Sequence, residues 1–283
     1  MAKTSSRSLP IAYKTLQYII LIFLACLSLL PFVIMIVNST RDSASIQAHA
    51  VSFIPSTHLK ENYAVFGGKL FNPWRGFLNS LIISTGATFC TIYFSTLTAF
   101  AIVAYDWKAS KGFFALIMCF LMIPQQVVGI GFFQFMYSID MVDSFIPLIL
   151  PSIAAPSTVF FMRQYMLSSL PMEILQSARI DGAGEFRIFN QIALPMMKPA
   201  MATQAIFSFV ISWNNLFMPQ ILLTSDSKYT MPLMVSQLRG DTYKAAHGAI
   251  YLGLTMSVLP LFVIYFALSK YIIAGVALGG VKE

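Results

Sequence analysis

The residues that could do chemistry gather in one polar stretch, Gln176 to Pro195, which reads QSARIDGAGEFRIFNQIALP in an otherwise apolar chain. After Gln176, its charged and amide side chains are Arg179, Asp181, Glu185, Arg187, Asn190 and Gln191. They offer no nucleophile beside a general base and no spacing typical of metal ligands. The chain also has no HExxH motif, no Walker sequence and no evident Ser/His/Asp set. We therefore expect no catalytic residue, no metal site and no cofactor bound by this chain.

The composition predicts a membrane protein built from helices. Of the 283 residues, 57% are hydrophobic and only 10% are charged, whereas a soluble domain carries roughly 25% charged residues. Cys26, Cys90 and Cys119 lie inside apolar runs and are expected to act as small hydrophobic residues. The basic start leads into an apolar run too long for a cleaved signal core. We predict an all-α, polytopic fold and a single domain over residues 1–283.

Six apolar stretches have the length of about 20 residues that a helix needs to cross a bilayer. We expect no soluble domain between them, because the two longest outside segments are only 38–76 and 223–249. The fourth stretch contains prolines near both ends, so its boundaries are the hardest to place. The predicted spans are 16–37, 77–103, 113–137, 145–162, 200–222 and 250–270.

The charges between the spans predict the orientation of the chain. With the N-terminus inside, the cytoplasmic segments hold eleven Lys and Arg against five acids, a balance of +6. The outside segments hold seven Lys and Arg against six acids, a balance of +1. An excess of basic residues is typical of the cytoplasmic loops of membrane proteins. These loops explain the net charge of +7, and we therefore expect no nucleic-acid partner. Both termini, and the polar stretch between spans four and five, are expected in the cytoplasm.

The interiors of the six spans contain no Asp, Glu, Lys, Arg or His. Ion-coupled carriers usually place ionisable groups at membrane depth, so their absence argues against a proton symporter or pump. Uncharged polar residues do occur there, and two interpretations stay open: hydrogen bonds between helices, or a pathway for a neutral, hydroxyl-rich solute. The candidate pathway residues are Asn79, Gln125, Gln126, Trp213, Asn214 and Asn215.

The polar stretch itself predicts a helix, a glycine turn and a second helix. Leu170, Ile174 and Ala178 recur at a helical spacing, and Phe186, Phe189 and Ala193 follow on one side of the next run. Between them, Gly182 can take the positive φ of a tight turn, and Pro195 and Pro199 mark the start of span five. Such a structured pair suggests docking to a cytoplasmic partner; an amphipathic loop resting on the membrane is the alternative.

These residues resemble the EAA loop of ABC importer permeases. That pattern is E-A-A, three residues, Gly, nine residues, Ile, one residue and Leu-Pro, and this chain has Gln176-Ser177-Ala178, Gly182, Ile192 and Leu194-Pro195 in register. Pro171, Glu173, the RIDGA run from Arg179 and the SWNN run from Ser212 with Pro219 are similar to the carbohydrate-uptake branch, as is the ending GGVKE. The similarity runs over the whole chain and is nearest to the smaller permease of maltose-type transporters.

The resemblance implies a type I importer permease of six spans, whose loop 163–199 carries a cytoplasmic coupling helix. The implied partners are a second, different permease, two copies of a cytoplasmic ATPase that bind ATP and Mg²⁺, and an extracytoplasmic sugar-binding protein, in the plasma membrane of a bacterium. Gln176 replaces the Glu of the motif and Ser177 its second residue, Ala, so a neutral hydrogen bond would replace any charge contact there. The implied coupling residues are Glu173, Gln176, Ser177, Ala178, Asp181, Gly182, Ala183, Ile192 and Pro195.

Two other functions remain open at this point. The first is an ABC permease for another polar solute, such as a polyol, a glycerol phosphate or a peptide. The second is a channel or an ion-coupled secondary carrier that works alone. Uptake that persists after ATP depletion, with the ion gradient intact, would favour this second alternative.

Overall fold

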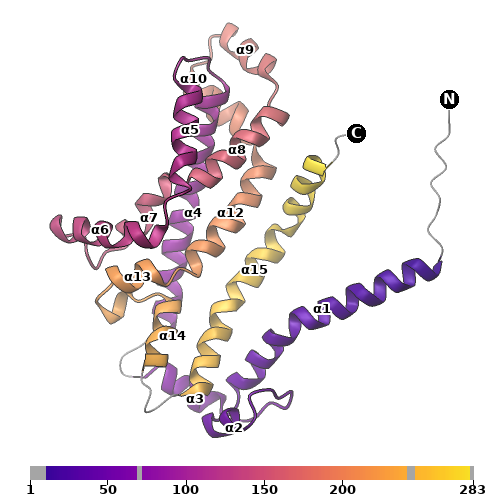
Figure 1. Ribbon diagram of the computed structural model, residues 1–283, viewed down its shortest axis with the longest axis vertical. Coiled ribbons are helices and arrows are strands. Elements are labelled where there is room, and N and C mark those ends of the chain that lie inside the picture. The colour runs from indigo at the N-terminus through magenta and orange to yellow at the C-terminus, as the bar shows by residue number, and fades with distance from the viewer. Residues whose placement is uncertain (1–10, 69–71, 241–245, 281–283) are drawn as a thin grey trace. The chain divides into compact units, whose positions relative to one another are not determined.

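The computed structural model describes residues 11–68, 72–240 and 246–280, and within these ranges the chain forms helices and no strand (Figure 1). The residues that end the chain, including GGVKE in part and the first basic residues, lie outside the described ranges. Contacts divide the chain into two compact units: Met1–Phe66 with Leu238–Thr255, and Gly67–Gln237 with Met256–Glu283. The single domain over 1–283 stays a prediction.

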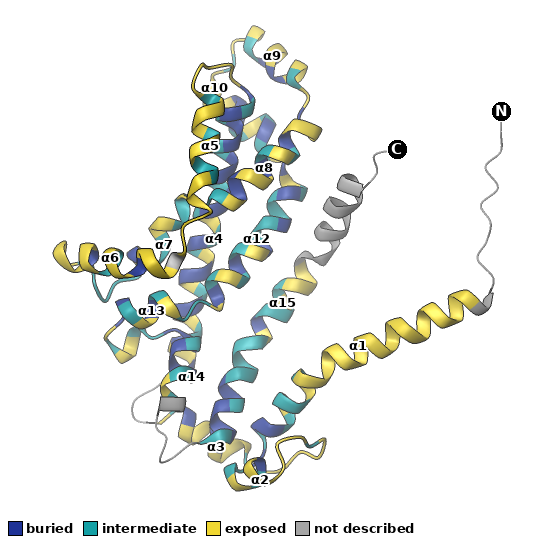
Figure 2. Ribbon diagram, in the orientation of Figure 1, coloured by how far each residue is buried: buried dark blue, intermediate teal, exposed yellow. Residues whose placement is uncertain are grey.

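In the first unit, a cluster of hydrogen-bonded polar residues follows the end of a long apolar helix. α1 (Ile11–Ser39) is followed by α2 (Ser43–Ala48) and α3 (Leu59–Phe66), and the unit includes the first turns of α15 (His247–Gly280). Arg41 is 8% exposed, and its guanidinium donates to Asn38 Oδ1 and to backbone carbonyls of α2 and its C-cap. In the 18-residue apolar part of α1 that is long enough to cross a membrane, no residue is buried in the structure (Figure 2).

The second unit is built on α4 (Pro73–Val103), which packs against α8 (Pro156–Ser169) and α12 (Lys198–Trp213) (Figure 1). Asn72 caps α4 through its side chain, and Pro73 occupies the first turn, where a missing N–H costs nothing. One face of α4 carries small residues that allow close packing. All six are at most 6% exposed: Ser80, Ser84, Ala87, Thr91, Ser95 and Ala99.

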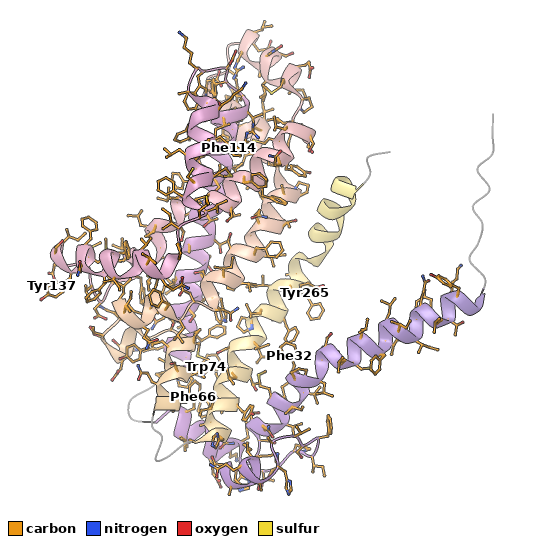
Figure 3. The ribbon with its side chains drawn as sticks, viewed as in Figure 1. Phe32, Phe66, Trp74, Phe114, Tyr137 and Tyr265 are labelled. Atoms are coloured by element: carbon orange, nitrogen blue, oxygen red, sulfur yellow. The ribbon has the colours of Figure 1, made fainter. Side chains whose placement is uncertain are left out.

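The predicted third span is not one continuous helix. α5 (Ser110–Phe120) ends before Pro124, and α6 (Gln125–Ser138) begins after it and runs in another direction (Figure 1). Proline lacks an N–H and disfavours the helical conformation at the residue before it. Figure 3 shows Phe114 on α5, whose ring lies 4.3 Å from the Arg163 guanidinium carbon of α8, and Tyr137 on α6.

The predicted fifth span is also interrupted, because α12 ends at Trp213 and α13 (Phe217–Leu222) is a separate helix. A 3₁₀ turn (Asp226–Lys228) and α14 (Met231–Gly240) follow. The fourth span joins α7 (Ile146–Ile149), a 3₁₀ turn (Leu150–Ile153) and α8.

Four helical segments of the described residues are long and apolar enough to cross a membrane. A fifth is added if the pair Glu185–Met196 and Lys198–Trp213, bent by 80°, is one span. The chain is therefore an all-α, multi-pass membrane protein, and the count of six spans stays a prediction. The four segments are Tyr13–Ser39, Pro73–Val103, Ile146–Ser169 and His247–Ala267.

The polar stretch lies at one end of the second unit. It begins within α9 (Met172–Ile180), contains α10 (Glu185–Ile188) and a π-helical segment (Phe189–Ala193), and ends within α11 (Leu194–Met196). Together with the ends of α4 and α8 it encloses the main buried cluster of this unit, which Figure 2 shows in dark blue. One side of the stretch is thus buried in the core of this unit, and its other side is exposed.

Candidate functional site

The turn between α9 and α10 has the geometry of a Schellman motif. Gly182 has φ +79°, its N–H donates to Arg179 O at 3.0 Å, and the Ala183 N–H donates to Ala178 O at 3.0 Å. These two bonds satisfy carbonyls that the helix end would otherwise leave unpaired. The predicted helix, glycine turn and helix are confirmed, and the positive φ explains why glycine occupies this position.

One side of the turn, called here its underside, packs in a buried apolar cluster against α4 and α8. Leu175, Ile188, Phe189 and Ala193 are at most 1% exposed, and they join one buried cluster with residues of α4 and α8. The Phe189 ring lies 5.4 Å from that of Phe100 on α4. Displacement of the turn would therefore disturb α4, because close-packed interiors transmit strain.

Two residues predicted on the buried faces point outward. Ile174 is 44% exposed and Phe186 is 74% exposed, whereas their neighbours Leu175 and Ile188 are buried. The other predicted positions are buried: Leu170, Ala178, Phe189 and Ala193 are at most 9% exposed. The helical period was therefore correct, and the exceptions arise because the elements that pack against a helix decide which of its residues are covered.

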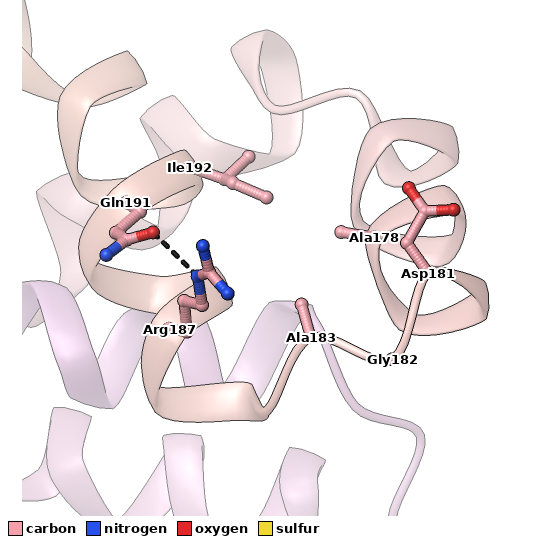
Figure 4. A pocket seen from close by; sticks show the side chains of 7 residues that line it. All are labelled: Ala178, Asp181, Gly182, Ala183, Arg187, Gln191 and Ile192. Carbon is pink, nitrogen blue, oxygen red and sulfur yellow. Dashed lines mark hydrogen bonds between the residues drawn. The ribbon is translucent and has the colours of Figure 1, made fainter.

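The exposed surface of the turn carries two large apolar side chains and an open pocket. Ile180 is 86% exposed just before Gly182, and Phe186 follows Gly182 at a distance of four residues. Between α9 and α10 an open pocket of about 320 Å³ separates the Asp181 carboxylate from Arg187, whose Nε donates to Gln191 at 2.9 Å (Figure 4). Its lining residues are Ala178, Asp181, Gly182, Ala183, Arg187, Gln191 and Ile192, five of which are predicted coupling residues.

The remaining predicted coupling residues lie around this pocket or on the same helices. Glu173, Gln176 and Ser177 are exposed on α9, and the Ser177 hydroxyl donates to Glu173 O at 2.9 Å. Pro195 is exposed on α11. The loop therefore brings these residues onto one continuous element, while their role in coupling stays a prediction.

A polar cluster that the sequence did not predict joins the two ends of the turn to α4. Glu185 accepts from Arg179 Nε at 2.7 Å and Nη2 at 3.2 Å, and from the Tyr105 hydroxyl at 2.6 Å. Arg179 Nη2 also donates to Ala104 O at 3.3 Å, and its guanidinium carbon lies 5.2 Å from the Tyr105 ring centre. Tyr105 lies 80 residues before Glu185 in sequence, so no local pattern could have indicated it.

The hydrogen bonds of this cluster fix its protonation states. Those from Arg179 and then Tyr105 lower the pKa of Glu185 below its usual value. The bond to Glu185 raises the pKa of Arg179, and burial followed by the bond to Glu185 raises the pKa of Tyr105. At neutral pH the cluster is an ionised pair with a neutral phenol as a second donor.

Two of the candidate pathway residues are engaged inside the second unit. Trp213 is 1% exposed, its Nε1 donates to Ser257 O at 2.8 Å, and its ring packs on Phe209 and Phe77. Asn79 Nδ2 donates to the carbonyls of Ser227 and Tyr229, both at 3.0 Å. In this conformation neither side chain faces an open surface.

The other candidate pathway residues lie near the break between α12 and α13 and on α6. Asn214 and Gln126 are exposed, and Asn215 Oδ1 accepts from Met218 N at 3.3 Å. α6 and α13 pack closely, because a Cβ on Gly129 would lie 2.5 Å from the Phe217 ring. Gln125 begins α6, and its side chain lies outside the described residues.

A second polar anchor, also absent from the sequence prediction, fixes the segment after α13. Asp143 Oδ1 accepts from the backbone N–H groups of Thr224 and Ser225, both at 3.0 Å. Its Oδ2 accepts from Ser225 Oγ at 2.6 Å and Lys228 Nζ at 2.9 Å. Burial raises the pKa of Asp143, but the hydrogen bonds from Ser225, Lys228 and Thr224 outweigh it and hold the pKa far below its usual value.

Comparison with known proteins identifies the family. The model of the family described as "Binding-protein-dependent transport system inner membrane component" matches residues 92–277, which include the turn at Gly182. The chain is 34% identical over 262 residues to the arabinooligosaccharides transport system permease protein AraQ of Halalkalibacterium halodurans, covering 92% of this chain and 93% of that protein. It is 30% identical over 282 residues to the lactose transport system permease protein LacG of Rhizobium radiobacter, covering 100% of both.

The fold is also that of a solved importer. A chain of a bacterial ABC transporter involved in the import of the acidic polysaccharide alginate matches with a TM-score of 0.76 at 19% identity, over 96% of this chain and 99% of that chain. The match of the family model to more than half of the sequence, with relatives at 30% identity or more over nearly its whole length, decides the assignment. The chain belongs to the inner membrane components of binding-protein-dependent transport systems, the non-catalytic permease subunits of ABC importers.

Proposed function

We propose that this permease forms half of the pathway of an ATP-driven importer for oligosaccharides. AraQ and LacG, which it resembles over nearly their full lengths, are named for the transport of arabinooligosaccharides and lactose. The interiors of its predicted spans carry amides and tryptophan but no Lys or Arg. A pathway for a glycerol phosphate would need such cations to pair with the phosphate, so a neutral sugar fits this chain better.

The proposed assembly contains a second, different permease, two copies of a cytoplasmic ATPase and an extracytoplasmic sugar-binding protein. ATP and Mg²⁺ would bind to the ATPase, and this chain would contribute no ligand to either. The basic excess of the predicted cytoplasmic segments supports an orientation with both termini in the cytoplasm, for a chain that crosses the bacterial plasma membrane six times. The candidate pathway then runs past Gln126, Trp213, Asn214 and Asn215, and Asn79 and Gln125 are further candidates.

The turn at Gly182 is the proposed contact with the ATPase. The observation that supports this proposal is the apolar surface and the pocket that the turn exposes. Ile180 and Phe186 flank the glycine with 86% and 74% of their surfaces exposed, beside a pocket that a partner side chain could enter. Clustered apolar surface next to polar groups is typical of binding sites. Because the underside of the turn is buried against α4 and α8, motion of the docked ATPase would reach the spanning helices.

Substitution of Gly182 tests this proposal. A Cβ at Gly182 would meet no atom of the described residues within 4 Å, so a side chain here projects away from them and toward the proposed partner. An L-residue at φ +79° costs about 1–2 kcal/mol, which the rest of the fold can absorb. We expect Gly182→Leu to reach the membrane at normal abundance but to lose ATPase co-purification or coupled sugar uptake, and Gly182→Ala to be milder.

Gly112→Leu is the matched control for this experiment. Gly112 is exposed on α5, and a Cβ there also meets nothing within 4 Å. It should therefore leave uptake and co-purification unchanged. Normal transport by Gly182→Leu would mean that the turn is not a close-fitting coupling element.

A further inference from the structure

Arg179, Glu185 and Tyr105 form a clamp across the glycine turn whose geometry is better than that of an ordinary surface ion pair. Arg179 and Glu185 meet through two bonds, at 2.7 and 3.2 Å, and Tyr105 adds a third at 2.6 Å. Isolated surface pairs contribute little to stability, but bidentate pairs within a network are the exception. Arg179 lies in the last turn of α9 and Glu185 in the first turn of α10, where each charge also suits the helix dipole.

The clamp adds side-chain bonds between the end of α9, the start of α10 and the end of α4. The turn 181–184 could act as a hinge between α9 and α10, with the open pocket between them. Glu185 closes this hinge through Arg179 and ties it through Tyr105 to the end of α4, where Arg179 also reaches Ala104 O at 3.3 Å. The bonds lie on the rim of the turn, since the side chains of Arg179 and Glu185 are 31% and 43% exposed.

α4 extends from this clamp to the opposite end of the second unit. At 1.5 Å per residue, its 31 residues span about 46 Å. Near its other end Asn79 holds the carbonyls of Ser227 and Tyr229, and Ser80 Oγ accepts from Met231 N at 2.9 Å. One helix therefore links the turn to the segment between α13 and α14.

We propose that Glu185 is a positioning residue that makes the turn move with α4 as one body. This inference rests on the proposed docking of the turn to an ATPase, and it assigns the clamp to transmission rather than to docking. Loss of the clamp leaves only the buried apolar contacts of the underside between the turn and α4. Part of the motion of the ATPase is then taken up by pivoting of the turn at Gly182, and less of it drives α4. The ATPase still binds, because Ile180, Phe186 and the pocket remain in place.

The test uses the full importer, with its own partner subunits, in proteoliposomes. We measure sugar taken up per ATP hydrolysed, together with the amount of ATPase that co-purifies. Glu185→Ala removes the clamp, Glu185→Gln keeps its shape without the charge, and Tyr105→Phe removes a single oxygen with little effect on folding. Asp106→Asn is the control, because Asp106 is an exposed carboxylate next to Tyr105 and its side chain makes no hydrogen bond or ion pair with a residue that the structure describes.

We expect normal co-purification for every variant and a fall of about two- to thirtyfold in sugar per ATP for Glu185→Ala. Glu185→Gln and Tyr105→Phe should give smaller falls, and Asp106→Asn none. An unchanged ratio for both Glu185→Ala and Tyr105→Phe would overturn the inference, as would loss of the ATPase from Glu185→Ala. Failure of the docking proposal would look different, because Gly182→Leu would then retain the ATPase and transport sugar normally.

Discussion

Asp143 shows how single side chains fix the segments between the helices of this permease. It has φ +59°, a conformation that Asp and Asn tolerate better than most residues. From this position its carboxylate reaches two backbone N–H groups, a hydroxyl and an ammonium of the segment after α13. One carboxylate thus holds together segments about 80 residues apart in the sequence.

The lowered pKa of Asp143 predicts how this anchor responds to pH. A carboxyl whose folded pKa lies below its unfolded value stabilises the fold above the unfolded pKa, near 3.8. That stabilisation is lost only as the pH falls further, through the folded value. We expect the protection of peptides covering 222–230 from amide hydrogen exchange, corrected for intrinsic rates, to stay constant from pH 7 down to about 4.

Asp143→Asn should lower this protection at every pH in that range, by roughly tenfold or more, since hydrogen bonds to a charged group contribute about 1.5–3 kcal/mol. Asp140→Asn is the control, because Asp140 also has a positive φ, of 55°, and is exposed. Equal protection in the two variants would show that Asp143 does not anchor the segment.

At the scale of elements, sequence patterns predicted correctly those features that depend on residues close together in the chain. The turn at Gly182 was predicted because glycine, the surrounding helical periodicity and the following prolines all act within a few residues. The break at Pro124 was missed, because the apolar runs on both sides read as one span and proline is tolerated within spanning helices. The burial of Leu175 instead of Ile174, and the bond between Tyr105 and Glu185, depend on segments distant in sequence, which a periodicity cannot specify.

The elements that carry the candidate pathway can be tested with cysteines. Gln126 and Asn214 are exposed near the contact of α6 with α13, so cysteines there should react with polar thiol reagents in at least one nucleotide state of the assembled importer. Asn215, which is half-buried, should react more slowly. A cysteine at Trp213, which is 1% exposed, should react only if the pathway opens around it.

The labelling needs a background in which Cys26, Cys90 and Cys119 are replaced, since all three are free thiols. A cysteine at Phe23 serves as the lipid-facing control, because it lies within the apolar α1. No reaction at any of the four positions in any nucleotide state would exclude them from the pathway.

At the scale of the whole molecule, the permease is a non-catalytic subunit that depends on another component for the energy of transport. Its family and relatives are components of larger transport systems, and its turn presents apolar surface that a partner would cover. The interiors of the predicted spans contain no Asp, Glu, Lys, Arg or His with which an ion gradient could be coupled. The central claim is therefore that transport requires ATP hydrolysed by another subunit.

Reconstitution of the purified chain in proteoliposomes, alone and with its partner permease, ATPase and sugar-binding protein, tests this claim most directly. The account predicts no ATP hydrolysis and no sugar uptake by the chain alone, under any ion gradient. It predicts uptake by the complete assembly only when both ATP and the loaded binding protein are supplied. Sugar accumulation by the single chain, or uptake by the assembly that persists without ATP, would contradict it.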